Sequence, residues 1–316
     1  MLKLQKQPIM RRVLASLAPI YLYSIWLYGL GALAIAALTF ALAIGVEWVF
    51  ERKRSGKVSE AVLVTAALYG LALPPRTPLW IAGVGIVFAV SMAKGVYGGF
   101  GRNLFNPAIA GRLFVYISFA TTLNLSYTSF GSFGAGAVDV LASATPLARM
   151  RTGAEIPIGD LLFGFKPGAV GEGMILLVIA AAIYLVATKT ASWRIMLAEI
   201  VAGIAMTAAL YFGGVKGALP LESLLAGSFL FTTVFMSTDP VSAPKKPLSQ
   251  LLYGALIGCA IVAIRSFSAF PEGTSFGILL GNTFASFIDQ LVPGKRAPRD
   301  APSNLPAAAA AREAAK

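Results

Sequence analysis

The sequence predicts an all-α integral membrane protein with about ten transmembrane helices. The 316-residue chain is 57% hydrophobic and only 13% charged, whereas soluble domains carry about 25% charged residues. Its apolar runs are separated by short segments rich in Pro, Gly and charge, and a membrane-spanning helix needs about 20 apolar residues. These observations exclude a soluble domain.

The predicted spans lie near residues 14–30, 32–50, 60–73, 78–93, 107–121, 171–188, 195–212, 221–237, 248–265 and 275–292. About five spans lie on each side of one long polar connection. An odd number per half makes the halves enter the membrane from opposite faces, as in inverted-repeat transporters. The expected domains are therefore a first membrane half (1–121), an outer loop (122–170), a second membrane half (171–292) and a disordered tail (293–316).

The basic residues set the orientation and argue against a nucleic-acid partner, because they lie in short loops between apolar runs. With the N-terminus in the cytoplasm, the inside segments hold 19 of the 26 Lys and Arg residues and the outside segments hold six. Since positive charge is retained inside, we expect both termini in the cytoplasm of a bacterial or archaeal cell and residues 122–170 outside.

Metal-based redox chemistry is not expected from this chain. It contains one cysteine, Cys259, and no histidine, which excludes a cysteine-ligated iron–sulfur cluster, a structural zinc site and His-ligated haem within the chain alone. Any redox role therefore requires an organic cofactor. Cys259 lies in an apolar run and is expected to be a small core residue.

The outer loop contains the segment DVLASATP, Asp139 to Pro146. An acid, several small or apolar residues and then Ala144-Thr145 resemble the acceptor pattern read by flavin transferases, which esterify FMN through its phosphate to a Thr hydroxyl. Thr145 would then hold a flavin on the outer face. The alternative is an ordinary Thr-Pro turn, which is a common loop element.

Two segments predict interrupted helices. In GGFGRNLFNPAIAGR, which starts at Gly98, the glycines permit positive φ and Pro107 begins or ends a helix. At membrane depth such a break persists only where it is buried in protein or lines a cavity, although a tight turn into the next span is equally compatible. In STDPVSAP, Asp239 precedes Pro240 and gives the same signature in the second half. Asp239 could hold a cation, but a capping or structural hydrogen bond is favoured.

Few other charges lie in or next to the spans. Glu172 opens the span after the loop, where the helix dipole favours an acid and where it could contact a flavin or a cation. Glu199 and Arg112 lie within spans, where charge is costly and marks either an ion path or pairing inside the bundle. The candidate cation path is therefore Asp239, Glu172 and Glu199. Glu47 and Asp289 lie near span ends and are expected to reach the interface.

Five segments together resemble one family over essentially the whole chain: GGFGRNLFNPAIAGR, DVLASATPL, KPGAVGE, STDPVSAP and GNTFASFIDQ. The chain is similar to the shared NqrB/RnfD family, whose members belong to the sodium-translocating NADH:quinone oxidoreductase or to Rnf electron-transport complexes. Its length is closer to the Rnf type.

The resemblance implies a ten-helix, urea-transporter-like inverted repeat and covalent FMN on Thr145. It implies a subunit, not an enzyme alone, of a multisubunit oxidoreductase that couples electron transfer to Na⁺ or H⁺ movement. The implied partners are iron–sulfur subunits, a second covalent-FMN subunit and a flavin transferase for maturation. Some relatives also hold riboflavin or quinone near the glycine motif, which corresponds here to Gly98, Gly99 and Asn106.

Two departures from the family pattern stand out. Ser143 replaces a glycine that usually precedes Ala-Thr, while Asp139, Ala144 and Thr145 match. Lys94 is followed by Gly95, where the quinone-reductase members typically have Glu, so the role of that acid does not transfer. The alternative function is a urea-transporter-like channel or small-solute transporter without flavin, which has no need of an acceptor threonine.

Overall fold

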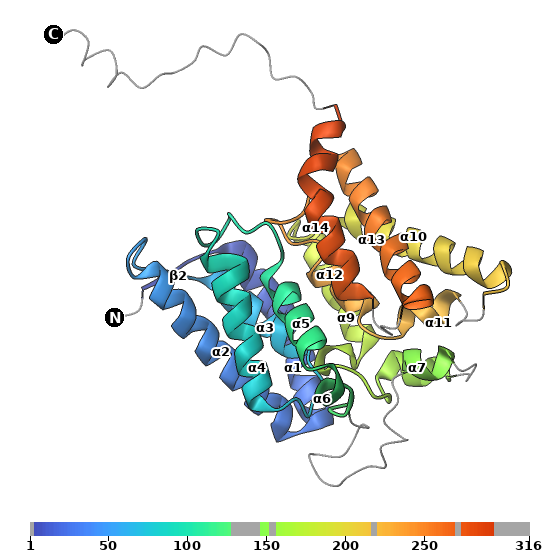
Figure 1. Ribbon diagram of the computed structural model, residues 1–316, viewed down its shortest axis with the longest axis horizontal. Helices are drawn as coiled ribbons and strands as arrows, with labels where there is room; N and C mark the ends of the chain where they lie inside the picture. The colour runs from blue at the N-terminus through green and yellow to red at the C-terminus, as the bar shows by residue number, and fades with distance from the viewer. Residues whose placement is uncertain (1–2, 128–145, 152–155, 216–219, 269–272, 294–316) are drawn as a thin grey trace.

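The computed structural model describes residues 3–127, 146–151, 156–215, 220–268 and 273–293, which are shown in Figure 1. The first part of the chain contains β1 (Lys3–Gln5), α1 (Pro8–Tyr28), α2 (Leu30–Glu51), β2 (Lys57–Ser59), α3 (Glu60–Leu71), α4 (Leu79–Val90), the π-helical turn η1 (Ser91–Gly95), α5 (Pro107–Ser118) and α6 (Ala120–Asn124). The second part contains α7 (Pro146–Arg151), α8 (Ile158–Phe163), the 3-10 turn η3 (Val170–Glu172), α9 (Ile175–Ala187), α10 (Trp193–Phe212), α11 (Pro220–Leu225), α12 (Phe229–Phe235), α13 (Pro247–Phe267) and α14 (Thr274–Leu291).

The chain is a helical membrane protein, and helices lie at every predicted apolar run. Within the part of the chain that the structure describes, α2, α10 and α13 are by themselves long and apolar enough to cross a membrane, and α3, α4 with η1, α5 and α9 are shorter apolar helices. The run at 221–237 is interrupted between α11 and α12, where Gly227 adopts a φ of 67°. The segment that was predicted to form the outer loop, residues 122–170, contains α7 and α8.

The all-α prediction misses one small parallel sheet, formed by β1 and β2 with Lys3 opposite Lys57 and Gln5 opposite Ser59. Hydrogen bonds to the start of α3 hold it in place. The Gln7 backbone N–H donates to Glu60 Oε2 at 2.6 Å, and the Ala61 backbone N–H donates to Gln7 Oε1 at 3.0 Å. These bonds attach the segment after β1 to the start of α3.

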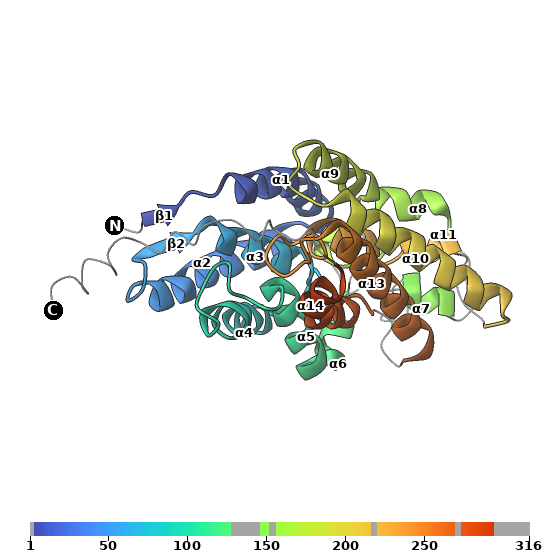
Figure 2. The same ribbon diagram turned by 90° about the horizontal axis from the view of Figure 1, so that it is seen from above.

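The helices pair in the same order in the two halves. In the first half α3 packs on α1 and α2, α4 packs on α2, and α5 packs on α4. In the second half α12 packs on α9 and α10, α13 packs on α10, and α14 packs on α13. The halves meet where α1 contacts α9 and where α5 contacts α14, and Figures 1 and 2 show α5 and α14 side by side.

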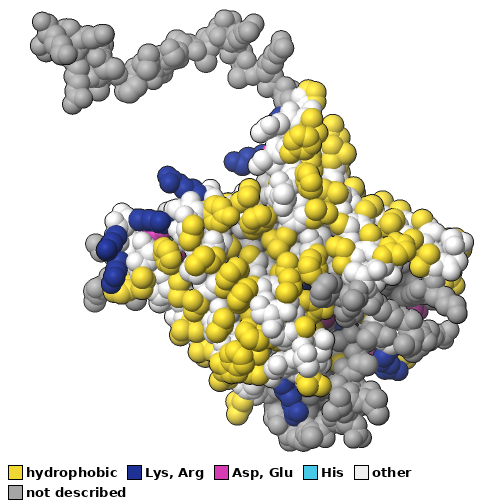
Figure 3. Space-filling model, in the orientation of Figure 1, with side chains coloured by type: hydrophobic (Ala, Val, Ile, Leu, Met, Phe, Trp, Pro, Cys, Tyr) yellow, Lys and Arg dark blue, Asp and Glu magenta, His cyan; other side chains and the backbone are white. Residues whose placement is uncertain are grey.

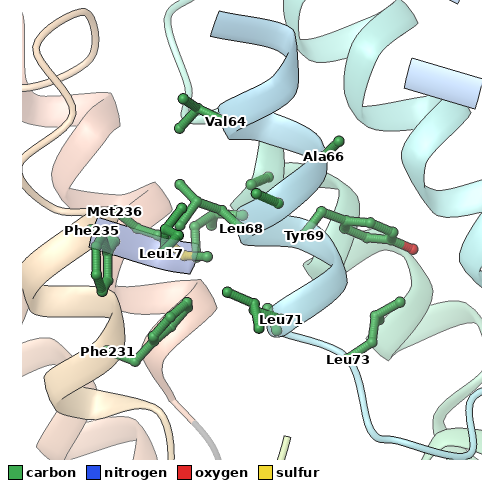
Figure 4. Close-up of a cluster of buried hydrophobic side chains, with 14 of the residues drawn as sticks. Leu17, Val64, Ala66, Leu68, Tyr69, Leu71, Leu73, Phe231, Phe235 and Met236 are labelled. Carbon is green, nitrogen blue, oxygen red and sulfur yellow. The ribbon is translucent and has the colours of Figure 1, made fainter. Parts of the chain in front are cut away.

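The hydrophobic core extends across this boundary between the halves. Figure 4 shows Leu68 and Leu71 of α3 facing Phe231 and Phe235 of α12, with Met236 beside them. Leu71 is fully buried and Phe231 is 2% exposed. Close packing of large apolar side chains from both halves in one cluster stabilises their association through van der Waals contacts.

Apolar side chains also cover much of the outside. In Figure 3 yellow side chains cover most of the visible helical body, and many of the Lys and Arg residues gather at the edge that bears β2. Exposed Leu197, Val201 and Phe212 extend along α10, as expected for a helix that faces lipid. Cys259 is exposed on α13, so the expectation that it is a core residue is wrong.

Candidate functional site

Both predicted helix interruptions line one cavity between the two halves, on the side of the bundle that bears β1 and β2. The cavity measures about 60 Å³, and its lining includes Lys94, Phe100, Asn103 and Asn106 from the first half and Thr238, Asp239, Pro240 and Val241 from the second. We call it the broken-helix cavity. Helices that stop inside a membrane protein leave backbone and side-chain polar groups at such a place.

Asn106 fixes the start of α5 at this cavity. Its Oδ1 atom accepts hydrogen bonds from the backbone N–H groups of Ala108 at 3.0 Å and Ile109 at 3.4 Å, which caps the helix. Pro107 occupies the first helical turn, where it requires no N–H partner. The Asn106 backbone N–H donates to Asn282 Oδ1 at 3.0 Å, so one residue joins α5 to α14.

The glycine motif forms a tight turn beside the cavity. Gly98, Gly99 and Gly101 have φ values of 108°, 93° and 85°, which side chains other than glycine rarely adopt. A Cβ atom on Gly99 would lie 2.5 Å from Glu51 Oε1. Phe100 and Asn103 line the cavity, whereas Gly98 and Gly99 shape the turn that places them.

Asp239 caps its own turn. Its Oδ1 atom accepts from the Val241 backbone N–H at 3.2 Å, and its Oδ2 atom accepts from Ser242 Oγ at 3.1 Å. Burial raises the pKa of this carboxyl group, while these two donors and the Lys94 ammonium act in the opposite direction. Asp239 thus has the structural hydrogen bonds that its sequence position favours, and it also lines the cavity.

A buried ion pair lies at the same cavity. Lys94 Nζ donates to Glu47 Oε2 at 2.7 Å and to Ser59 Oγ at 2.8 Å. Glu47 is 4% exposed and Lys94 is 2% exposed, so the expectation that Glu47 reaches the interface is wrong. Lys94 lies in η1, and single π-helical turns are frequent at functional sites.

A second polar cluster lies between the halves around Arg112 of α5. The guanidinium donates to Ser228 Oγ at 3.0 Å and to Thr274 Oγ1 at 3.2 Å, and its NH2 atom lies 3.8 Å from Glu172 Oε1. Arg112 therefore joins α5 to the starts of α12 and α14. This is the pairing inside the bundle that was one of two expectations for an intramembrane arginine.

Two further buried cations lie near this cluster, beside α11 and α12. Lys166 Nζ donates to the Leu225 carbonyl oxygen at 2.9 Å, and Arg265 donates to the Ser223 carbonyl oxygen at 2.8 Å. Burial lowers the pKa of Lys166 to about 8, with Glu172 opposing this shift and Arg265 adding to it.

The three acids of the candidate cation path lie in different surroundings. Asp239 lines the broken-helix cavity, Glu172 faces Arg112, and Glu199 of α10 accepts a hydrogen bond from Thr233 Oγ1 at 2.8 Å. Glu199 is fully buried. Among the residues that the structure describes, no three metal-ligating side chains gather in one place.

The proposed flavin acceptor lies outside the described residues, together with Asp139, Ser143 and Ala144. Pro146, the residue directly after Thr145, begins α7. Leu147 and Met150 of α7 are buried in a small core with Leu161, Ile175 and Ala226. The C-terminal neighbour of the acceptor is therefore anchored to the second membrane half.

Sequence reasoning missed Lys94, Lys166 and Arg265 as buried site residues. Lys94 and its partner Glu47 are two intramembrane charges of opposite sign, which is a signal for a pair. However, the separation of 47 positions between them leaves the partner unspecified. Lys166 falls in the predicted outer loop, and Arg265 is the last residue of the predicted span 248–265 and was counted with the outside charges, where basic residues need no partner.

A family model matches residues 3–297, and its description is the NQR2, RnfD, RnfE family. The chain belongs to this family. It is 38% identical over 277 residues to the related subunit of the Na(+)-translocating NADH-quinone reductase of Chromohalobacter salexigens, with 84% of this chain and 67% of the relative covered. It is 31% identical over 325 residues to the related subunit of the ion-translocating oxidoreductase complex of Shewanella amazonensis, with 91% and 92% covered.

The two kinds of relative differ in length. The match to the quinone-reductase relative of Neisseria meningitidis is 37% identical and covers 82% of this chain but 66% of the relative. The chain therefore spans about two thirds of the quinone-reductase relatives and nearly all of the oxidoreductase-complex relative.

Proposed function

We propose that this family member is a membrane subunit of a redox-driven, ion-translocating electron-transport complex. The family match over residues 3–297 carries the proposal, because relatives of both kinds are named as subunits of ion-translocating oxidoreductases. The apolar helices support residence in a membrane. The charge distribution supports the cytoplasmic membrane with both termini inside and the α7 region outside.

The repeated order of helix pairing supports the finer expectation of an inverted repeat. In this interpretation α3 and α12 are equivalent short helices that meet at the centre, and α5 and α14 are equivalent helices that contact each other across the boundary. The interrupted segment around Asn106 and the turn at Asp239 both belong to the central cavity. This arrangement is expected for substrate and ion paths in such folds.

The cofactor of the proposed function is FMN, esterified through its phosphate to Thr145. The acceptor pattern stands directly before α7, whose Leu147 and Met150 are anchored in a core. Leu225 packs against that core and accepts the hydrogen bond of Lys166. Buried positive charge close to the anchored segment favours a phosphate-bearing group there. Bound FMN would supply one-electron and two-electron transfer at the outer surface.

A denaturing gel under ultraviolet light tests the flavin assignment. The full chain, produced with its flavin transferase, should give a fluorescent band. Intact-mass analysis should show that one FMN unit is attached through its phosphate. Thr145→Ala should remove both signals, whereas Ser143→Ala should keep them because only the threonine matches the acceptor position. A fluorescent Thr145→Ala band, or a wild-type chain of unmodified mass, would refute the assignment.

A second, non-covalent riboflavin or quinone does not fit the broken-helix cavity as it stands. A cavity of about 60 Å³ holds a few water molecules or an ion, since one water needs about 10–15 Å³ on this measure. Pockets that bind drug-sized ligands measure about 300–1,000 Å³. A neighbouring cavity of about 440 Å³ is large enough and is lined by Phe100, Gly101 and Val241, so we assign a ring-shaped ligand to that cavity.

Asp239 is the acid that we propose for the inner end of the cation path, because it lines a cavity of water and ion size. Glu172 faces Arg112 of α5 across the boundary between the halves, and Glu199 of α10 accepts a hydrogen bond from Thr233 of α12 within the second half. The alternative of an open channel without flavin is less well supported. Between the two polar regions the apolar side chains of α3 and α12 are in contact (Figure 4).

A further inference from the structure

Another cavity lies between the end of α9 and the starts of α10 and α13; Figure 2 shows these three helices. It has a volume of about 600 Å³, and Lys189, Arg194 and Lys245 all line it. No Asp or Glu is among its lining residues in the described part of the chain. We call it the basic cavity. Three cations without a carboxylate between them create a positive potential that attracts an anion.

The walls of the basic cavity are held by specific hydrogen bonds. Ser192 Oγ donates to Gln250 Oε1 at 2.8 Å, and Gln250 Nε2 donates to the Pro244 carbonyl oxygen at 3.2 Å. These bonds fix the start of α10 against the start of α13. Lys189 adopts a φ of 53°, a strained value for a lysine that persists only where the surroundings impose it. These hydrogen bonds and the backbone conformation at Lys189 therefore hold the three basic residues around the cavity.

The nearest acids are engaged elsewhere. Asp289 accepts from the backbone N–H groups of Lys245 at 2.9 Å and Lys246 at 3.3 Å. Asp239 accepts from Val241 and Ser242 and lines the broken-helix cavity. Neither carboxylate lines the basic cavity, so the acids of the described chain that lie next to its lining residues in sequence or in hydrogen bonding do not balance its charge.

The position of the cavity identifies the source of that anion. Trp193 lines it, is half exposed and carries the Arg194 guanidinium 5.1 Å from its ring centre. Trp residues with an apolar body and a polar edge gather at the membrane interface. Just beyond the cavity, Leu197 of α10 and Leu252 of α13 are exposed, which gives acyl chains an apolar surface directly below the charged group.

We propose that the basic cavity binds the phosphodiester headgroup of an anionic membrane phospholipid. Lys189, Arg194 and Lys245 would surround the phosphate, Trp193 would lie at headgroup level, and the acyl chains would follow α10 and α13. Basic pockets between membrane helices recognise lipid headgroups in this way. The cavity shares Thr238 and Pro240 with the broken-helix cavity, so the bound lipid would also support the turn that carries Asp239.

Native mass spectrometry of the full chain, titrated with phosphatidylglycerol or phosphatidylcholine, tests the proposal. Wild-type protein should retain phosphatidylglycerol in preference to phosphatidylcholine. Lys189→Gln with Arg194→Gln should weaken phosphatidylglycerol retention about 30-fold, since each cation near the membrane contributes about 1 kcal/mol. The charge-keeping pair Lys189→Arg with Arg194→Lys should retain the lipid, which separates loss of charge from loss of folding.

A matched control exists in the first half of the chain, because Arg52 lies 5.6 Å from the Trp48 ring centre and lines neither the basic nor the broken-helix cavity. Arg52→Gln with Lys53→Gln removes the same charge and should leave lipid retention unchanged. An equal loss in this control, or no headgroup preference in wild type, would overturn the proposal. Displacement by millimolar inorganic phosphate would instead assign the cavity to a soluble phosphate. Displacement by an acidic segment of another protein in the complex would assign it to a protein contact.

Discussion

Removing one partner of the Glu47–Lys94 pair should destabilise the protein strongly. Lys94→Met leaves the Glu47 carboxylate with the hydroxyl and backbone N–H of Ser59 as its remaining donors, in a place where it is 4% exposed. Breaking a buried pair in this way costs about 3–5 kcal/mol, because the remaining charge is buried without compensation. Glu47→Leu should cost a similar amount, since it leaves the Lys94 ammonium buried without its carboxylate partner.

The double variant separates this cost from the loss of contacts. Glu47→Leu with Lys94→Met removes both charges and replaces them with apolar groups of similar length, a change that is often close to neutral. Its free energy of unfolding should therefore lie well above the value expected from adding the two single losses. Such non-additivity is expected for residues in direct contact.

The assay is equilibrium unfolding of the purified chain in detergent, followed by tryptophan fluorescence. Lys53→Met is the matched control, because it removes a lysine that is exposed after the end of α2. Exposed charges contribute little, so this variant should unfold close to wild type. If Lys94→Met were no less stable than Lys53→Met, the pair would not be buried as described.

Two further predictions concern the glycine turn and the buried lysine. Gly99→Ala should lower the free energy of unfolding by about 1–2 kcal/mol, because Gly99 has a φ of 93° and an L-residue is strained there. Gly45→Ala is the control in the same assay. Gly45 lies inside α2 with open space around it, so this variant should be neutral or stabilising. Lys166 has its pKa lowered to about 8 by burial, so between about pH 8 and 10.5 the unfolded chain binds a proton that the folded chain does not, and stability should rise with pH. Lys166→Met should remove that part of the rise in pH-dependent unfolding, and an unchanged slope would contradict the burial of Lys166.

The helices were predictable because each apolar run is bounded by a local signal. Gly29 ends α1, Asn106 and Pro107 start α5, and Pro247 starts α13. These are effects of neighbouring residues on the backbone. The interruption between α11 and α12 was missed, although Gly227-Ser228 lies inside that run, because a single glycine within an apolar segment is often tolerated.

The composition of the site was only partly predictable. The motifs around Asn106 and Asp239 were recognised separately as interruptions, and no feature of the sequence shows that they share a cavity. Such a juxtaposition depends on how the two halves pack. For Arg112 the sequence left two interpretations open, and its bonds to Ser228 and Thr274 required the positions of α12 and α14.

Gly95 stands where the quinone-reductase members of the family typically have a glutamate, and the packing around Gly95 explains the difference. A Cβ atom on Gly95 would lie 3.0 Å from the Phe50 ring, so a glutamate there would require the ring to move. The negative charge beside Lys94 comes instead from Glu47, one turn before Phe50 on α2. The quinone-reductase members typically have a glutamate directly after this lysine, and this chain has Gly95 there. In this chain a carboxylate from a neighbouring helix, Glu47 of α2, pairs with the Lys94 ammonium group instead.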